Sequence, residues 1–421
     1  MAEYYLGLDF GTSGARACLI DSAGDVVHEK RFTYSDSPWQ QTEDWRAALI
    51  ELLSSIPTEA RSRLVAVAVD TTSGTVLLTD ADGQALGPAL LYSDASAVEE
   101  AQTLAALAGE QQFVASPSSG LSKLLRLQNQ IGSERARHAC HQADWLTGLL
   151  SGRFGISDYH NALKTGCDLE SLTWPSWIQA LPIWPLLPEI VAPGSTICRL
   201  DPVVASRFAL NPACVVRAGT TDSIAAFIAA GGNQPGEAVT SLGSTLVLKL
   251  LSETRVDDPE CGVYSHRYGR LWLAGGASNA GAAVFRQYFS DQQLADLSQR
   301  INAEEDSGLD YYPLPAQGER FPVSDPQLPP RLEPRPADDR AFLHGLLESI
   351  ARIEAQGYRK LVELGATPPK RVVTAGGGAK NETWRRIRQR ALGVPVEVSS
   401  QTEAAYGAAT VARLGTDVLA D

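Results

Sequence analysis

The feature that most constrains this chain is a strand–turn–strand pattern that occurs twice. Leu6–Phe10 and Ala15–Ile20 are apolar runs separated by Gly-Thr-Ser-Gly, and residues 238–249 repeat the design around Gly243-Ser244-Thr245. A glycine-containing turn between two apolar runs is typical of a β-hairpin. Two copies of one supersecondary unit, more than two hundred residues apart, indicate an internally duplicated protein with two lobes.

Length and periodicity extend this interpretation. At 421 residues the chain is too long for one compact core, so we expect two domains. The first would comprise residues 1–228 with a closing helix at 402–421, and the second residues 229–401. Apolar runs that alternate with helical patterns predict an α/β fold. Strands are expected at 4–10, 15–21, 25–33, 64–70 and 75–79, helices at 43–55, 94–108 and 338–364, a helical region at 120–152, and loops at 174–188 and 313–336.

Charge and cysteine usage exclude some classes of partner. The formal net charge of −13 argues against nucleic acid and anionic membranes as partners. The six cysteines are scattered, and in a chain of this length we expect free thiols and a reducing, cytoplasmic compartment. The sequence shows neither a signal peptide nor an apolar run long enough for a membrane span. His138-x-Cys140-His141 is interpreted as a helix surface rather than a metal site.

The glycine turns suit phosphate binding. Small residues let backbone N–H groups point into a concavity, and the hydroxyls of Thr12, Ser13, Ser244 and Thr245 add donors. Either turn alone would be interpreted as an ordinary hairpin. A third turn, Gly376-Gly377-Gly378, follows the strand at 371–373 and precedes a helix, which is the setting for a nucleotide. Neither a P-loop nor a Rossmann fingerprint occurs in these turns, so Mg²⁺ and backbone donors would supply most of the electrostatic stabilisation.

Two aspartates stand beside glycine-hydroxyl turns. Asp9 lies inside the first strand, where an unpaired buried carboxylate is costly, and Asp222 follows Gly219-Thr220-Thr221. If the two lobes face each other, these carboxylates would converge. Phosphoryl transfer needs one such group for Mg²⁺ and one to orient and deprotonate the attacking hydroxyl. The alternative for each is capping of a turn. Arg16, two places into the outgoing strand, is expected in solvent.

Together these segments resemble the FGGY family of carbohydrate kinases, within the superfamily of actin, hexokinase and Hsp70 ATPases, and the resemblance runs along the whole chain. Leu6–Ser13 and Ser241–Thr245 resemble the two phosphate motifs, and Gly219–Asp222 resembles the segment with the catalytic base. Gly318–Pro322 is similar to the family's Gly-Glu-Arg-x-Pro element, and Gly376–Asn381 to its adenosine motif. The resemblance implies a duplicated, actin-like and ribonuclease H-like fold with a catalytic cleft between its lobes.

The resemblance also implies roles. Asp222 would be the base, Asp9 would position Mg²⁺ and contact the sugar, and Ser73 would be a further sugar contact. The residues implied to bind ATP are Thr12, Ser13, Gly243, Ser244, Thr245, Gly276, Gly377, Asn381 and Trp384. Gly276 is also compatible with a tight turn after a strand.

The sugar-facing segments depart from the best-known members of the family. Where xylulose kinases carry Gln-Met-His-Gly and glycerol kinases an Arg-Glu pair, this chain has the loop Asp70–Thr75, and Tyr92–Ser96 lacks the family's arginine. The loop is most similar to that of the cyanobacterial and plant-plastid branch, which implies D-ribulose as the substrate rather than D-xylulose. The alternatives are another sugar or polyol kinase, an actin-like ATPase switch, or a non-catalytic sensor of sugar or nucleotide.

Overall fold

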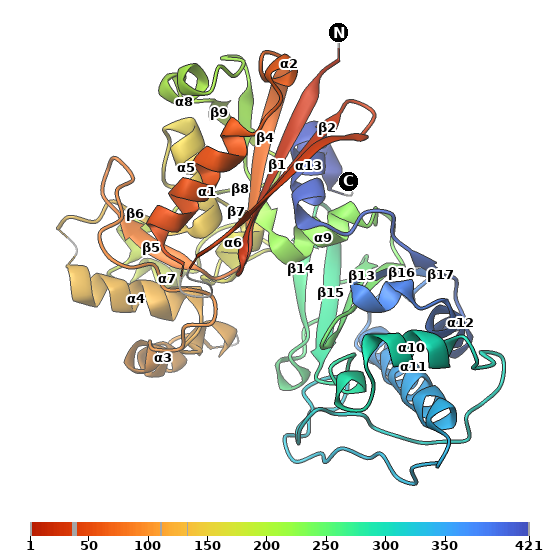
Figure 1. Ribbon diagram of the computed structural model, residues 1–421. Coiled ribbons are helices and arrows are strands. Elements are labelled where there is room, and N and C mark those ends of the chain that lie inside the picture. The colour runs from red at the N-terminus through yellow and green to blue at the C-terminus, as the bar shows by residue number, and fades with distance from the viewer. Residues whose placement is uncertain (1, 36–39, 110–111, 133, 420–421) are drawn as a thin grey trace. The chain divides into compact units, whose positions relative to one another are not determined.

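The structure, a computed structural model, describes residues 2–35, 40–109, 112–132 and 134–419. The chain divides into two units (Figure 1). Unit 1 comprises Met1–Ala229 together with Glu403–Leu419, and unit 2 comprises Ala230–Thr402. Unit 1 is therefore built from two separate segments of chain.

Unit 1 is organised around a mixed sheet in the order β3-β2-β1-β4-β10-β9, with β11 beside β4. The hairpins from β1 to β3 are antiparallel, whereas β4 runs parallel to β1. The strands are β1 (Tyr4–Phe10), β2 (Gly14–Asp21), β3 (Val26–Thr33), β4 (Leu64–Thr71), β9 (Thr196–Arg199), β10 (Val215–Arg217) and β11 (Thr220–Thr221).

The side chains of β1 point alternately to the two faces of the sheet, and each face is covered by a different layer. Leu6, Leu8 and Phe10 belong to a core with Trp45 of α1 (Thr42–Ser54) and Trp145 of α5 (Gln142–Ser151). The opposite face is covered by α13 (Ala404–Leu414), which also packs against α9 (Asp222–Ala229). Because side chains alternate along a strand, Asp9 lies on the α13 face, at the carboxyl end of β1.

A largely helical insert completes unit 1 and has its own core around Leu121, Leu124 and Leu127 of α4 (Gly120–Ile131). Its other elements are β5 (Val76–Thr79), α3 (Val98–Ala105), β6 (His138–His141), β7 (Ile156–Asp158), α6 (Tyr159–Leu163), α7 (Ser176–Gln179) and β8 (Glu189–Val191). Two short helices, α2 (Thr58–Arg61) and α8 (Pro202–Arg207), pack instead on the core of the main sheet through Ala60 and Ala205. The expected helix surface at His138–His141 is wrong. These residues form a strand because they pair antiparallel with Val76–Thr79.

Unit 2 repeats the design of unit 1. Its sheet has the order β14-β15-β13-β12-β16-β17, in which β12 is antiparallel to β13 and parallel to β16, just as β1 is antiparallel to β2 and parallel to β4. The predicted α/β duplication is confirmed. The strands are β12 (Glu237–Leu242), β13 (Leu246–Ser252), β14 (Tyr264–Tyr268), β15 (Leu271–Ser278), β16 (Arg371–Ala375) and β17 (Val396–Val398).

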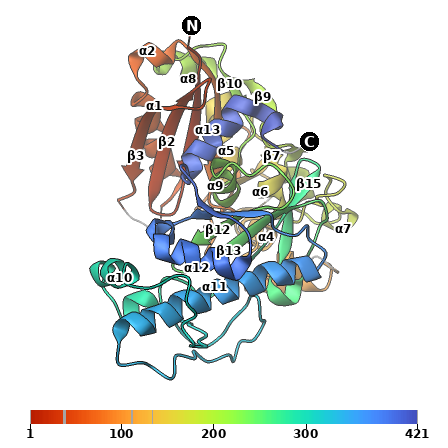
Figure 2. The same ribbon diagram turned by 90° about the vertical axis from the view of Figure 1, so that its right-hand side faces the viewer.

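The helices of unit 2 are α10 (Asp291–Ser298), the long α11 (Asp339–Glu363) and α12 (Glu382–Leu392). Figure 2 shows α11 running beside α12, and α11 also packs against α10 and the sheet. The proline-rich segment 313–336 contains neither a helix nor a strand, as predicted.

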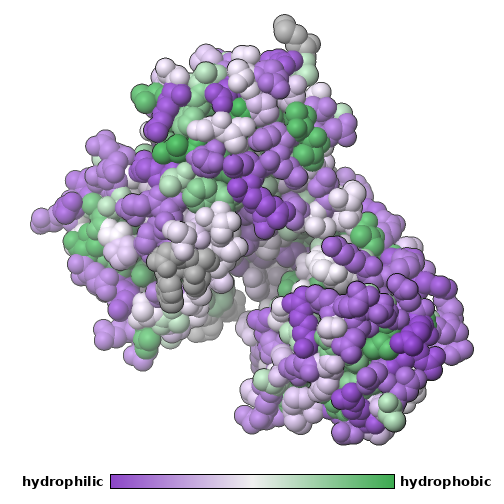
Figure 3. All heavy atoms as spheres, in the orientation of Figure 1, coloured by the Kyte–Doolittle hydropathy of each residue, from purple (hydrophilic) through white to green (hydrophobic). Residues whose placement is uncertain are grey.

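The surface and the thiols agree with the composition. Hydrophilic side chains dominate the face in Figure 3, and hydrophobic residues form small separate groups on it. In the part of the chain that the structure describes, no helix is both long and apolar enough to cross a bilayer. All six cysteines are free thiols.

Candidate active site

Asp9, the carboxylate inside the first strand, has a cationic partner. It is 5% exposed, and its Oδ2 accepts a hydrogen bond of 3.4 Å from Nη1 of Arg16, its cross-strand partner on β2. Arg16 also pairs with Glu403 at 3.0 Å. Burial raises the pKa of Asp9 to about 6, although Arg16 lowers it. Arg16 was expected in solvent. Its side chain is 40% exposed, but its guanidinium forms an ion pair with Asp9.

Asp70 is a member of the site that sequence reasoning missed. It lies at the end of β4 in register with Asp9, on the same face of the sheet, and is 0% exposed. Neither carboxyl oxygen receives a hydrogen bond from an N–H or hydroxyl donor of the described residues. Burial, followed by the charges of Asp9 and Asp222, raises the pKa of Asp70 well above its ordinary value. The available signal in the sequence was that two apolar runs, 4–10 and 64–71, each carry an aspartate at the last position but one.

Asp222 reaches the same edge of the sheet by a close approach of the backbone. A Cβ on Gly219 would lie 1.8 Å from the carbonyl oxygen of Val69, so only glycine lets the chain run against β4. Thr220 then pairs with Asp70, and Asp222 begins α9, where its Oδ1 accepts from the Ser223 amide at 2.6 Å.

The Asp222 charge raises the pKa of both Asp9 and Asp70, so the three carboxyls form one group. The convergence of Asp9 and Asp222 is confirmed, but its expected cause is wrong. Both belong to unit 1 and are brought together by one sheet, not by two facing lobes.

Ser73 lies in the loop between β4 and β5. Its neighbours are fixed: Thr72 Oγ1 donates to Gln142 Oε1 at 3.1 Å, and Thr75 Oγ1 accepts from the Tyr92 amide at 3.0 Å. Ser73 itself is half-buried, and among the described residues its hydroxyl enters no hydrogen bond. The loop therefore carries one short hydroxyl, three positions beyond Asp70, that enters no hydrogen bond among the described residues.

The first glycine turn connects β1 to β2 in unit 1. The Gly11 amide donates to the Gly14 carbonyl at 3.0 Å, and the Ser13 carbonyl accepts from the Tyr34 amide at 3.2 Å. Ser13 is exposed and Thr12 half-buried. Both hydroxyl residues thus lie three and four positions beyond Asp9, at the same edge of the sheet.

The second and third glycine turns lie side by side in unit 2, because they end the paired strands β12 and β16. Gly243, Ser244 and Thr245 form the turn between β12 and β13, with Ser244 exposed. Gly377 is exposed, and a Cβ there would meet no atom within 4 Å. Asn381 is half-buried, and its Oδ1 caps α12 by accepting from the Trp384 amide at 3.0 Å.

Two of the predicted nucleotide residues are used in packing. The Trp384 ring is 2% exposed, lies edge-on to Phe285, and donates from Nε1 to the Leu347 carbonyl at 3.0 Å. The ring therefore belongs to the core, and a place for Trp384 beside adenosine stays a prediction. Gly276 lies inside β15, not at a turn, and a Cβ there would meet the Phe321 ring at 2.7 Å.

A buried ion pair in unit 2 is hydrogen-bonded to the two strands that precede the glycine turns. Arg388 of α12 donates from Nε and Nη2 to Glu354 of α11 at 2.6 and 2.7 Å. Glu354 accepts from Thr240 on β12 at 2.6 Å, and Arg388 donates to Thr374 on β16 at 2.7 Å. Each threonine stands two or three residues before its glycine turn, so the pair ties the two strand ends together.

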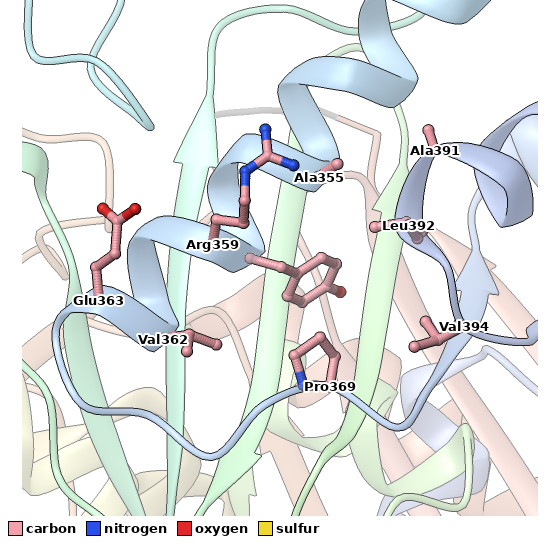
Figure 4. Close-up of a pocket in the computed structure, with 9 residues that line it drawn as sticks. Ala355, Arg359, Val362, Glu363, Pro369, Ala391, Leu392 and Val394 are labelled. Carbon is pink, nitrogen blue, oxygen red and sulfur yellow. The ribbon is translucent and has the colours of Figure 1, made fainter.

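Figure 4 shows a groove of unit 2 that is separate from these turns. It has a volume of about 400 Å³ and lies between the C-terminal parts of α11 and α12, beside Pro369. Pro369 precedes β16, whereas Gly376 follows it, so the groove is at the opposite end of that strand. None of the predicted nucleotide-binding residues lines it.

The described residues contain no group of three or more His, Cys, Asp and Glu side chains arranged to hold a metal ion. A cation at the Asp9 carboxylate would thus need further ligands from a substrate.

Comparisons with known proteins identify the class and then the family. The chain is 26% identical to a xylulose kinase of Klebsiella pneumoniae, over 99% of this chain and 91% of the relative. It is 22% identical to a gluconokinase of Bacillus subtilis, over 92% of this chain and 82% of the relative. A ligand-bound xylulose kinase structure from Lactobacillus acidophilus superposes with a TM-score of 0.83 at 19% identity, covering all of this chain and 90% of the other.

These likenesses define a carbohydrate kinase fold. The N-terminal domain model of the FGGY family of carbohydrate kinases matches residues 4–229, and the C-terminal domain model matches residues 238–415. The chain belongs to the FGGY family and is an ATP-dependent carbohydrate kinase.

Proposed function

We propose that this kinase transfers the γ-phosphoryl group of ATP to a terminal hydroxyl of a ketopentose, D-ribulose, to give D-ribulose 5-phosphate. The observation that carries the proposal is the convergence of Asp9, Asp70 and Asp222 at the end of β4, from which the loop with the unbonded hydroxyl of Ser73 continues. Carboxylates and a hydroxyl suit a polyhydroxylated substrate, because each sugar O–H can donate to an acid and accept from a serine.

Within this proposal Asp222 is the general base. It accepts the proton of the sugar hydroxyl as that oxygen attacks the γ-phosphorus, while the bond from phosphorus to the bridging oxygen of ADP breaks. Asp9 and Ser73 orient the sugar. In unit 2, the turns at Gly243–Thr245 and Gly376–Asn381 bind the phosphates and adenosine through backbone N–H groups and hydroxyls. Thr12 and Ser13 assist at the phosphates, and unit 1 thus binds the sugar and unit 2 the nucleotide.

Mg²⁺ fits this donor set as a partner of ATP. Kinase magnesium is held by one or two carboxylates together with substrate phosphates and water. Asp9 offers such a carboxylate, oriented by the hydrogen bond that Arg16 donates to its Oδ2. Bound there, Mg²⁺ would neutralise charge on the phosphates. The six free thiols support a reducing compartment such as the cytoplasm.

D-xylulose is the alternative substrate, because curated relatives of this chain are named xylulose kinases. The support for D-ribulose is the loop Asp70–Thr75, where the resembled xylulose kinases carry Gln-Met-His-Gly. A serine side chain is smaller than a histidine side chain and offers a hydroxyl instead of an imidazole, so both the space and the hydrogen-bonding group beside the sugar would differ. The two ketopentoses differ only in the configuration at one carbon, so one such contact can discriminate between them.

The proposal is tested by ADP release from Mg-ATP with D-ribulose, D-xylulose, L-ribulose, gluconate, glycerol or no sugar. We expect D-ribulose to stimulate most, and Asp222→Asn to lower that turnover by at least about 100-fold because the proton acceptor is lost. Asp82→Asn, a change at an exposed aspartate of unit 1, is the matched control and should leave turnover unchanged. Near-normal turnover by Asp222→Asn would refute the mechanism, and equal ADP release with every sugar would refute the substrate class.

A further inference from the structure

A lysine of unit 1 is buried without an acidic partner. Lys123, in the second turn of α4, is 0% exposed, and none of the ion pairs among the described residues includes it. An ammonium group is costly to bury unless its N–H groups are hydrogen-bonded. Burial lowers the pKa of Lys123 to about 8, opposed by the charge of Asp94. A methionine would fill the same space without this penalty, so packing alone does not account for a lysine here.

The acceptors of Lys123 are two backbone carbonyls from different loops. Nζ donates to the carbonyl of Gly74 at 2.6 Å and to that of Leu91 at 2.7 Å. Gly74 immediately follows Ser73 and has a φ of +84°, a conformation that glycine adopts without strain. Leu91 opens the turn 91–94, in which its carbonyl also accepts from the Asp94 amide at 3.0 Å.

The hydrogen bond from Lys123 to Gly74 adds to two others that hold the loop around Ser73. Thr72 is bonded to Gln142, Thr75 to the Tyr92 amide, and Gly74 to Lys123, so every neighbour of Ser73 is held while its own hydroxyl is not. Charge-assisted hydrogen bonds are stronger than neutral ones, and one ammonium can hold two carbonyls at once. The loop is thereby prevented from exchanging conformations around a flexible glycine.

We propose that Lys123 is a positioning residue for the sugar. It fixes the Gly74 and Leu91 carbonyls so that the Ser73 hydroxyl and the turn 91–94 are already arranged when the sugar binds, which lowers the ordering cost of binding. Lys123 itself does not touch the substrate. This inference rests on the proposed function, because it gives Ser73 its role as a sugar contact, and it adds a determinant of sugar affinity that lies outside the carboxyl group.

The test is the variant Lys123→Met in the full chain, assayed with the stimulating sugar. We expect the KM for the sugar to rise about tenfold or more, because two charge-assisted hydrogen bonds are lost, and the KM for ATP to stay within about twofold. The matched control is Leu127→Ala, a buried leucine one turn further along α4 whose side chain offers no hydrogen bond to either loop carbonyl. It should lower stability through a cavity and leave the sugar KM unchanged.

Hydrogen exchange supplies a readout that does not depend on activity. Peptides that cover residues 71–78 and 90–95 should exchange faster in Lys123→Met than in wild type or Leu127→Ala. Lys123→Gln, which keeps a neutral donor, serves if the methionine variant does not fold, and should give an intermediate KM. Equal KM shifts in the lysine and leucine variants would overturn the proposal, as would unchanged exchange in both peptides.

The outcomes also separate this inference from the proposed function. If no sugar stimulates the wild type, the proposed function and the sugar role of Lys123 both fail. If a sugar stimulates but its KM is unaffected in Lys123→Met and Lys123→Gln, only the role of Lys123 fails. A rise confined to the sugar KM, together with faster exchange of the two loops, supports both.

Discussion

Among the single residues of the site, Asp70 is a carboxyl that forms no ion pair with a cation of the described residues. Asp9 is paired with Arg16, whereas Asp70 is paired with no cation in the described chain and has no access to water, and burial and the charges of Asp9 and Asp222 outweigh the opposing charge of Arg16. The least costly state of such a group is the neutral acid, which can also donate a hydrogen bond to the neighbouring carboxylate. Asp70 is therefore expected to keep its proton at pH values at which an exposed aspartate has lost it.

This expectation gives a pH-dependent stability. The unfolded chain releases the Asp70 proton near pH 4, whereas the folded protein retains it up to the raised pKa. Above pH 4 the folded state therefore binds more protons, and its free energy of unfolding falls by up to about 1.4 kcal/mol per pH unit until that pKa is passed. Asp70→Asn removes this dependence. Urea denaturation of both proteins from pH 4.5 to 8.5 should show the variant gaining on the wild type as pH rises; a constant difference would mean an ordinary carboxylate.

The sequence allowed some of these residues to be predicted and concealed others. Asp9 and Asp222 were identifiable because each stands beside a glycine-hydroxyl turn. Asp70 and Arg16 were not, since their importance depends on which strands become neighbours and in which register. Trp384 stands beside a glycine turn, which suggested a ligand, and helical periodicity also points its ring into the core.

At the scale of elements, local periodicity was enough for the hairpins and the long helix. Strands at 4–10, 25–33 and 64–70 and the helix at 338–364 agree with β1, β3, β4 and α11 to within a residue or two. His138–His141 failed because its pairing partner, Val76–Thr79, is some sixty residues away in the sequence. The pairing of Thr220 with Asp70 is likewise long-range, so no local pattern could place Asp222.

The ion pair between α11 and α12 is the element-level prediction. Arg388→Met would leave the charge of Glu354 buried without its partner, which typically costs about 3–5 kcal/mol of stability. Adding Glu354→Gln removes that charge and keeps an acceptor for Thr240, so the double variant should recover much of the loss. A double-mutant cycle by urea denaturation measures both effects. If Arg388→Met alone were neutral, the pair would have no role in holding β12 and β16 together.

The whole molecule has a discontinuous first unit and a continuous second one. Unit 2 has a core drawn only from residues 238–396, whereas unit 1 needs the returning helix α13 to cover one face of β1 and β2. Ala405 and Ala409 of α13 pack on Cys18 and Ile20, and the Tyr406 hydroxyl donates to the Gly24 carbonyl at 3.1 Å. The two-domain expectation from length could not show that dependence, which follows from how the chain returns to its first sheet.

A chain that ends at Thr402 should therefore lose unit 1 and keep unit 2. Without α13, the apolar faces of β1, β2 and α9 are open to water, and the lost burial is worth roughly 25 cal/mol per Å². Limited proteolysis followed by mass spectrometry should find protected fragments from residues 230–402 and rapid cleavage throughout 1–229. A chain that ends at Gly415 retains α13 and is the matched control, in which both units should resist the protease. Protection of residues 1–229 in the shorter chain would show that unit 1 holds its fold without the returning helix.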